Sequence, residues 1–290
     1  MKKITIDWGY DSLLLFGNSS SPVDAIRDIQ KNAFDKYGIE IHIIPYSGIQ
    51  SSFSGGRPTD QTLEYFTEKI NVLNESGKSF NLVFNGGLRF GSQINNYNLS
   101  TERKSMSFLS KNNEIYGVEN FITITHNTLF KLAKENYPNL KIISSCIQQL
   151  DPENLNDYKE LFLKYDYVIP LNQHTSYDIL SQFSQFANQM IVFLFLTCSL
   201  NNLYRCYLHY QRIETMSSIC STKEPFTVSG EEFNAVPKNM NITKTSLVGG
   251  QLAKRPEDLR KLLDMGVNKF KIQRSRRLFT DDFDKFLSSI

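Results

Sequence analysis

The sequence contains few cysteines and no long apolar run, and both features narrow the classes of protein that it can encode. No window approaches the roughly 18 apolar residues of a transmembrane helix. The N-terminus, MKKITIDWGYD, contains an acidic residue too near its start to form the apolar core of a signal peptide. Without such a signal, the four cysteines (Cys146, Cys198, Cys206 and Cys220) are expected to be reduced thiols. We therefore expect a cytoplasmic protein with no membrane partner.

The charge balance and the missing motifs exclude further classes. A net charge of +2 gives no general attraction to nucleic acid, and the basic cluster Arg274–Arg277 is typical of a solvated loop. No G-x-G-x-x-G follows an expected strand and no GxxxxGK[ST] occurs, so there is no nucleotide cofactor motif. HExxH, GxSxG and paired-carboxylate signatures are also missing. The expected partner is therefore a small molecule or a peptide.

What the sequence does have is a regular alternation of apolar runs and amphipathic segments. Met190–Leu196 is the clearest case, because it is too short to span a bilayer and is typical of a strand buried on both faces. The same pattern predicts strands at Lys3–Trp8, Ile39–Pro45, Phe80–Phe84, Asn120–Thr125, Leu140–Ser145, Tyr167–Leu171, Met190–Leu196 and Lys269–Gln273, with Ile242–Val248 as a ninth candidate.

Helical patterns separate these strands. They run from Pro22 to Gly38, from Thr59 to Ser76, and across Ser100–Ser110, Thr128–Tyr137, Pro152–Lys164, Ser176–Asn188 and Arg255–Met265. We expect an α/β fold, a single (β/α)8 TIM-type barrel over residues 1–290, irregular or incomplete, with a long excursion at 198–240 after the seventh strand. An open doubly wound sheet, or two smaller domains, is the alternative.

Polar residues that follow the strands are the candidate site, because loops at the carboxyl ends of parallel strands carry the ligands in such folds. A lone histidine beside a strand, or an arginine in a Gly-rich turn, is otherwise an ordinary surface residue. The predicted catalytic residues are His126, His174, Arg205, His209 and Lys271, and the predicted substrate-binding residues are Arg57, Asn85, Asn127 and Asn172.

The cysteines permit three interpretations. Thiolates at Cys146, Cys198, Cys206 and Cys220 could ligate an iron–sulfur cluster or, alternatively, zinc. Cysteine is also commonly a small buried apolar residue. A Cys nucleophile paired with His209 or His174 is the third interpretation.

The C-terminal part of the sequence contains Pro256-Glu-Asp-Leu259, Gly266-Val267 and Phe270-Lys271-Ile272. These motifs resemble the segment that closes the barrel in the collagenase-like peptidase family U thirty-two. Tyr137–Ser145 is similar to a strand of the same family. Leu196–Tyr210 and Ser54–Pro58 resemble segments of a poorly characterised branch of its superfamily.

The resemblance implies a barrel with its site at the mouth. In several members that site holds an iron–sulfur cluster for oxygen-independent hydroxylation of RNA bases or quinone precursors, and other members are described as peptidases. The matching positions are Cys198, Arg205, His209 and Lys271. The expected function is accordingly a peptidase-like or hydroxylase barrel enzyme, with a metal-free Cys/His peptidase or amidase, or a degenerate barrel that only binds, as alternatives.

Overall fold

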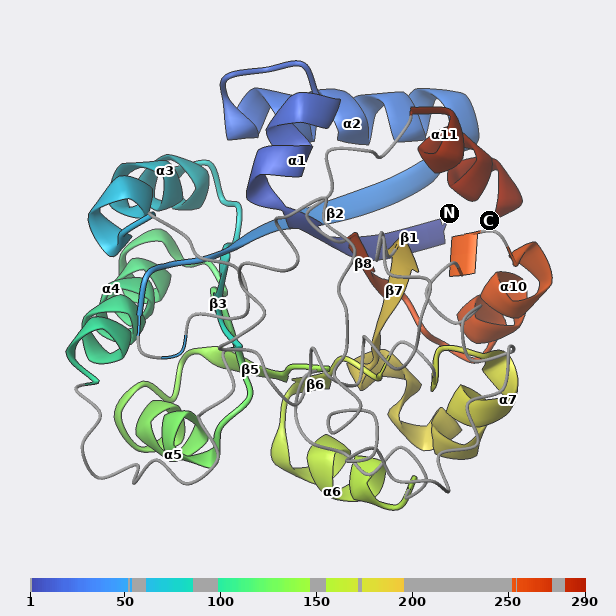
Figure 1. Cartoon of the computed structure of the whole chain (residues 1–290). Helices are drawn as coiled ribbons and strands as arrows, with labels where there is room; N and C mark the ends of the chain where they lie inside the picture. Colours follow the sequence, from blue (N-terminus) through green and yellow to red (C-terminus); the bar gives the residue numbers. More distant parts are fainter. Residues whose placement is uncertain are drawn as a thin grey trace, which may run out of the picture.

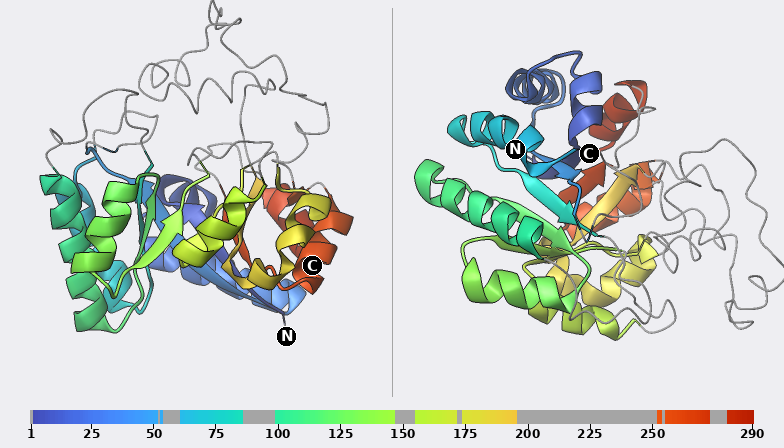
Figure 2. Two further views of the ribbon diagram at one scale, coloured as in Figure 1. Left: turned by 90° about the horizontal axis from the view of Figure 1, so that it is seen from below. Right: turned by 60° about the vertical axis from the view of Figure 1, so that its left-hand side comes forward.

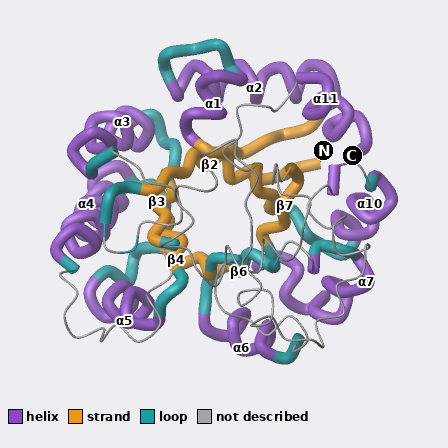
Figure 3. The backbone as a smooth tube through the Cα atoms, in the orientation of Figure 1, coloured by secondary structure: helices purple, strands orange, loops and turns teal. Residues whose placement is uncertain are grey.

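Eight parallel strands form a ring at the centre of the molecule (Figure 1, Figure 3). The computed structural model describes residues 2–51, 53, 61–85, 99–146, 155–171, 174–195, 252–253, 255–272 and 280–290. Within these residues the strands are β1 (Lys2–Gly9), β2 (Ile39–Gly48), β3 (Asn81–Phe84), β4 (Phe121–Ile124), β5 (Lys141–Ser144), β6 (Tyr167–Val168), β7 (Ile191–Phe195) and β8 (Lys269–Ile272).

The strand order brings the two edges of the sheet together. The order is β6-β5-β4-β3-β2-β1-β8-β7, and every pairing is parallel. A single parallel bridge between Val168 and Met190 links the two ends of this order. The result is a nearly closed barrel of eight parallel strands, which confirms the expected α/β fold.

Helices surround this ring on its outer side (Figure 1, Figure 2). They are α1 (Tyr10–Phe16), α2 (Pro22–Tyr37), α3 (Leu63–Glu75), α4 (Ser100–Tyr116), α5 (Asn127–Asn136), α6 (Asp157–Lys164), α7 (Tyr177–Leu180), the 3-10 helix η3 (Ser181–Gln189), α10 (Pro256–Asp264) and α11 (Thr280–Ser289). Among the helices of these described residues, none combines the length and the hydropathy of a membrane span.

Local sequence signals fix where several helices begin and end. The Ser21 hydroxyl accepts a hydrogen bond from the Asp24 amide at 3.3 Å, and Pro22 follows at the first helical position. Gly38 ends α2 with φ = 67°, a conformation that glycine adopts without strain. The helix predicted between Pro22 and Gly38 is therefore confirmed.

Three helical predictions need correction. The cap of α3 is Thr62, whose hydroxyl accepts from the Tyr65 amide at 3.3 Å, rather than Thr59. The segment Ser176–Asn188 divides into the short helix α7 and the 3-10 helix η3, with Phe183 outside helical geometry. The segment after the first strand, for which no helix was predicted, contains the seven-residue helix α1, which is too short to show a helical period of its own.

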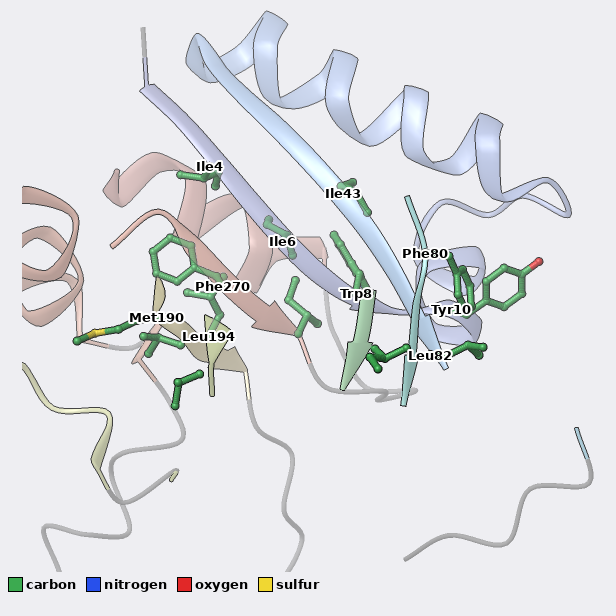
Figure 4. Packing of buried hydrophobic residues seen from close by; sticks show 14 of the residues in the cluster. Ile4, Ile6, Trp8, Tyr10, Ile43, Phe80, Leu82, Met190, Leu194 and Phe270 are labelled. Atoms are coloured by element: carbon green, nitrogen blue, oxygen red, sulfur yellow. The ribbon is translucent and has the colours of Figure 1, made fainter. Parts of the chain in front are cut away.

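Alternate residues of each strand face either the helices or the barrel interior. On β1, Ile4, Ile6 and Trp8 form one row, and Figure 4 shows them beside Ile43 of β2. The Trp8 ring lies 5.0 Å from Phe283 of α11, between centroids. This outer layer is the main hydrophobic core, and it holds the helices against the strands.

A second, smaller cluster fills part of the barrel interior. It consists of Ile44, Phe121, Ile143, Cys146, Ile169, Ile191 and Phe193, with Tyr167 packed against it. The two chain termini lie side by side (Figure 2), where the Lys2 ammonium donates a hydrogen bond to the Ile290 carbonyl. The candidate strand Ile242–Val248 and the excursion at 198–240 lie outside the described residues.

Candidate functional site at the carboxyl ends of the strands

A buried ion pair lies inside the barrel between β1 and β8. Asp7 and Lys271 are register partners, and their side chains are 3% and 7% exposed. The Lys271 ammonium donates to Asp7 Oδ2 at 2.9 Å, and the Asn81 amide donates to the same oxygen at 3.0 Å. Thr123 in turn donates to Asn81 Oδ1 at 3.0 Å. Charges buried this deeply are tolerated only when they are paired and hydrogen-bonded.

The predicted catalytic lysine, Lys271, is held from a second side by Tyr46. The ammonium lies 3.6 Å from the centroid of the Tyr46 ring, a cation–π contact. The Tyr46 hydroxyl donates to the Ile272 carbonyl at 3.2 Å, which fixes the ring in place. Lys271 therefore stands as one partner of a rigid ion pair that joins β8 to β1, and a catalytic role for it stays a prediction.

A tyrosine is hydrogen-bonded to the predicted catalytic histidine His174. The Leu171 amide donates to the Tyr158 oxygen at 2.9 Å, and the same oxygen lies 2.8 Å from His174 Nδ1. The imidazole tautomer sets which of these two side chains donates the proton. Burial foremost raises the pKa of Tyr158 well above its usual value; the Leu171 amide opposes this shift and the neighbouring Cys146 thiol adds to it. Tyr158 thus remains neutral across the physiological range.

His126 and Asn127, at the end of β4, serve the start of helix α5. His126 Nδ1 accepts from the Thr128 amide at 3.1 Å, so the imidazole acts as the N-cap. Burial lowers the pKa of His126, and its ring lies 5.9 Å from the ring of Phe53. Asn127 is exposed and accepts from the Lys164 ammonium at 2.8 Å. A catalytic role for His126 stays a prediction, as does substrate binding by Asn127.

The first turn of α4 contains a residue that the sequence did not single out. Glu102 is fully buried, and neither of its carboxylate oxygens accepts a hydrogen bond in the described part of the chain. The N-terminal end of a helix favours negative charge, but an unbonded buried carboxylate remains costly and calls for an explanation. An acid in a first turn is common in sequences, and only burial distinguishes this one.

A hollow of about 330 Å³ lies beside that turn. Its lining comes from the segment that follows β2 and from the first turns of α3 and α4: Gln50, Ser51, Thr62, Leu63, Glu64, Thr101 and Lys104. Asn85, the predicted substrate-binding residue, directly follows β3 and is partly buried. This end of the barrel therefore offers amide, hydroxyl and ammonium groups around a small cavity.

The structure brings some of the predicted residues together and leaves others undescribed. Cys146 lies close enough to Tyr158 to affect its pKa, and Tyr158 is bonded to His174. Lys271 belongs to a different group, inside the barrel with Asp7. The remaining predicted residues lie outside the described residues: Arg57, Asn172, Arg205, His209, Cys198, Cys206 and Cys220.

The described residues give no support to the expected metal centre. They contain no group of three or more histidine, cysteine, aspartate or glutamate side chains placed to hold a metal ion. Cys146 is buried in the interior apolar cluster and forms no disulfide with a described residue. In this part of the chain, burial as a small apolar side chain accounts for the cysteine.

Comparison with known families contradicts the resemblance to collagenase-like peptidases. The family model that describes RNA cap guanine-N2 methyltransferases matches residues 89–252, more than half of the chain. No curated protein matches the chain. The match points to methylation. The predicted peptidase, amidase and iron–sulfur hydroxylase functions are therefore wrong, and so is the alternative of a degenerate barrel that only binds. The same finding contradicts the predicted iron–sulfur or zinc cofactor. It also contradicts the expectation that no nucleotide-type cofactor is used.

The structure explains why the peptidase-like segment misled. Pro256 stands at the start of α10, Gly266 follows that helix with φ = 106°, and Lys269–Ile272 is β8. Proline, glycine and an apolar run at this spacing are typical of a helix that leads into a strand, whatever the family. The segment also lies beyond the residues that match the family model. By the match over residues 89–252, the chain belongs to the RNA cap guanine-N2 methyltransferase family.

Proposed function

We propose that this protein transfers a methyl group to N2 of a guanine in an RNA cap, with S-adenosylmethionine as the donor. The observation that carries the proposal is the family match over residues 89–252. The matched residues include the four strands from β4 to β7 and the helix α4 that carries Glu102. RNA thus becomes the proposed partner, although the net charge of +2 did not suggest one.

The described residues offer a suitable environment for the donor near the start of α4. Glu102 has two unbonded carboxylate oxygens, which could accept hydrogen bonds from the ribose hydroxyls or the amino group of S-adenosylmethionine. Lys104, which lines the nearby 330 Å³ hollow, could pair with the carboxylate of the donor. Gln50 and Ser51 add neutral polar groups to the same hollow. The orphaned carboxylate of Glu102 is the feature that this cofactor would explain.

S-adenosylmethionine, when bound, supplies a methyl group attached to a positively charged sulfur. The guanine amino nitrogen forms a bond to the methyl carbon while the carbon–sulfur bond breaks, which leaves a neutral thioether, and the nitrogen then loses one proton to solvent. Asn85 is suited to orient the amino group, because its side chain makes no hydrogen bond with the described residues and it lies at the carboxyl end of β3. A carbonyl oxygen there would accept one N–H and direct the nitrogen lone pair away from itself.

The barrel geometry supports the same location. We propose that the nearly closed ring is a (β/α)8 barrel of the TIM type and that residues 1–290 form a single domain, since the Val168–Met190 bridge links its two edges. Enzymes with that architecture place their sites at the carboxyl ends of the strands. Asn85, His126, Cys146 and His174 all follow strands at this end.

The test is a methyl-transfer assay with defined RNA. The purified protein is incubated with S-adenosylmethionine carrying an isotopically labelled methyl group and with capped or uncapped RNA of the same sequence. Digestion to nucleosides and mass spectrometry then locate the label. Label on N2 of the cap guanine, and its loss in uncapped RNA, are the expected results. Label at another atom, or none with capped RNA, contradicts the proposal.

Variants on helix α4 separate donor binding from folding. Glu102→Gln keeps the shape of the side chain and removes its charge, so binding of S-adenosylhomocysteine measured by calorimetry should weaken at least tenfold. Glu114→Gln, on the exposed face of the same helix, is the matched control and should bind as the wild type does. Equal affinity in both variants would exclude Glu102 from the donor site.

A further inference from the structure

A second cavity lies at the opposite, amino-terminal end of the barrel. Its volume is about 390 Å³, within the lower range of pockets that hold small molecules. Barrels of this kind usually fill their interior with side chains, and the amino-terminal face usually serves stability. The lining residues come from seven strands, from the end of α4 and from the turns that precede β3 and β4. The cavity is therefore distinct from the proposed methyl-transfer site.

One wall of this cavity carries polar atoms that make no hydrogen bond with the described residues. Thr5 and His42 are register partners on β1 and β2, and Asp7 follows Thr5 on the same face of β1. Among the described residues, the Thr5 hydroxyl and the His42 imidazole make no hydrogen bond, and Asp7 receives both of its bonds on Oδ2. Asp7 is only 3% exposed, and its other oxygen, Oδ1, accepts no hydrogen bond from the described residues, so it is an available acceptor in the cavity wall.

The opposite wall is apolar and partly aromatic. It is formed by one inward residue from each of four consecutive strands, which are Phe121, Ile143, Tyr167 and Ile191. The Phe121 and Tyr167 rings lie 6.0 Å apart between centroids. These four strands lie across the barrel from β1 and β2. A ligand between the two walls would meet flat apolar surface on one side and hydrogen-bonding groups on the other.

Both carboxylates that line the cavity are paired with ammonium groups, so the ligand needs no positive charge. The charge of Asp7 is matched by Lys271, and that of Glu119 by Lys141 at 3.4 Å. Lys269 donates to the Asn188 carbonyl at 2.9 Å. Burial, followed by the nearby Lys78 and Lys3, lowers the pKa of His42, against the smaller influence of Glu40 and Asp7. A neutral His42 offers one donor and one acceptor.

We propose that this cavity binds a small, uncharged heteroaromatic molecule whose ring carries both an N–H donor and a nitrogen acceptor. The N–H group bonds to Asp7 Oδ1, the ring nitrogen accepts from Thr5 or His42, and the ring packs on Phe121 and Tyr167. The argument does not depend on the methyl-transfer proposal, because none of these residues lies at the carboxyl ends of the strands.

Two probes that differ in one group test the proposal on the wild-type protein. Benzimidazole has the N–H donor and the acceptor nitrogen, whereas 1-methylbenzimidazole lacks the N–H. Saturation-transfer NMR and calorimetry at about pH 7.5 should show binding of benzimidazole and at least tenfold weaker binding of 1-methylbenzimidazole. Absence of benzimidazole binding at millimolar concentration, or equal affinity for both probes, would overturn the proposal.

Variants then place the bound probe. His42→Leu removes polar groups from one wall, and Ile191→Phe fills space from the other, and each should weaken benzimidazole binding at least tenfold. Glu40→Gln is the matched control, because Glu40 lies two residues before His42 on β2, pairs with Lys3 and does not line the cavity. Unchanged affinity in both cavity variants would refute this location. Affinity for S-adenosylhomocysteine should be the same in all three variants, which keeps the two proposals separable.

Discussion

The two ends of helix α4 bury polar side chains in opposite ways. Near its C-terminal end, Asn112 donates to Asn74 at 2.9 Å, and Asn113 accepts from the Asn120 amide at 2.8 Å. In its first turn, Glu102 is equally buried and its oxygens have no hydrogen bond in the described part of the chain. Buried polar groups that are bonded specify a structure, whereas an unbonded one reduces stability. The difference suggests that one end of α4 serves folding and the other serves a ligand.

The asparagine cluster explains how the amino-terminal ends of β3 and β4 are held. Asn120 Oδ1 accepts from the Phe80 amide at 2.8 Å and from Asn74 at 3.0 Å. Asn74 also donates to the Lys78 carbonyl at 2.8 Å. These bonds connect α3 and α4 to the turns that lead into the two strands. At the carboxyl end of β3, in contrast, the Asn85 side chain makes no such bond with the described residues.

The largest effect is expected from breaking the bonded ion pair inside the barrel. Lys271→Met leaves Asp7 buried without its countercharge, which should lower the free energy of unfolding by about 3–5 kcal/mol. Urea denaturation followed by circular dichroism measures this change. The double variant Asp7→Asn/Lys271→Met removes both charges and keeps an acceptor for Asn81, so it should recover most of the loss. Equal destabilisation of the single and double variants would show that the pairing is unimportant.

Removal of one bonded asparagine should have the next largest effect. Asn120→Ala leaves the Phe80 amide and part of the Asn74 side chain without partners, which should cost about 3 kcal/mol. Asn136→Ala is the matched control, because Asn136 is exposed on α5. Its denaturation midpoint should match the wild type. A cost for Asn120→Ala no larger than that of the control would remove the contrast between the two ends of α4.

Replacement of the unbonded glutamate, Glu102, should stabilise the protein, in contrast to the two preceding substitutions. Glu102→Leu removes a buried charge that has no hydrogen bond among the described residues, so the free energy of unfolding should rise by roughly 1–2 kcal/mol while methyl transfer is lost. Thermal unfolding and the labelled-methyl assay measure the two effects. Glu114→Leu, exposed on the same helix, should change neither by a comparable amount. Destabilisation by Glu102→Leu would mean that the carboxylate is structural.

The smallest expected effect concerns pH. Burial lowers the pKa of His126 in the folded protein, so below about pH 6.5 the unfolded chain binds more protons than the folded one. Stability is then present above that pH and is lost as the pH falls through the lower folded pKa. Because the ring is partly exposed and screened by solvent, the contribution should stay below about 1 kcal/mol.

His126→Asn tests this pH effect with the helix cap retained. Asparagine is a good N-cap and does not titrate, so the drop in unfolding free energy between about pH 7 and pH 5 should be smaller than in the wild type. His42 responds in the same direction in both proteins, and its contribution cancels in the comparison. An identical pH dependence in both proteins would contradict the assignment.

Much of the architecture could be predicted because it depends on the local periodicity of apolar residues in the sequence. All eight strands were expected near their observed positions, since an apolar run between turn residues has few other structures available. Tertiary contacts hold the helices that were missed, α1 and α11: the ring of Tyr10 in α1 packs on Phe66 at 5.6 Å between centroids, and that of Phe286 in α11 packs on Phe270 at 5.9 Å. Local sequence does not report such contacts.

The candidate site was predicted less well, for a physical reason. His126 and Lys271 were chosen by residue type and position after a strand, but their partners, the Thr128 amide and Asp7, give them capping and pairing contacts. Glu102 was missed because burial without a hydrogen bond is a property of packing. The family was wrong because short motifs of proline, glycine and apolar residues recur wherever a helix leads into a strand.

The sequence by itself determined the alternation of strands and helices, the capping of α2 by Ser21 and Gly38, and the inward and outward faces of each strand. These features depend on neighbours within a few residues. Only the tertiary structure decided that Asp7 meets Lys271, 264 positions away in the chain, that Tyr158 is hydrogen-bonded to His174, and that Glu102 is buried without a bond in the described residues. Each of these depends on which distant groups share a low-dielectric interior, where the presence or absence of one partner determines the energy of a polar group.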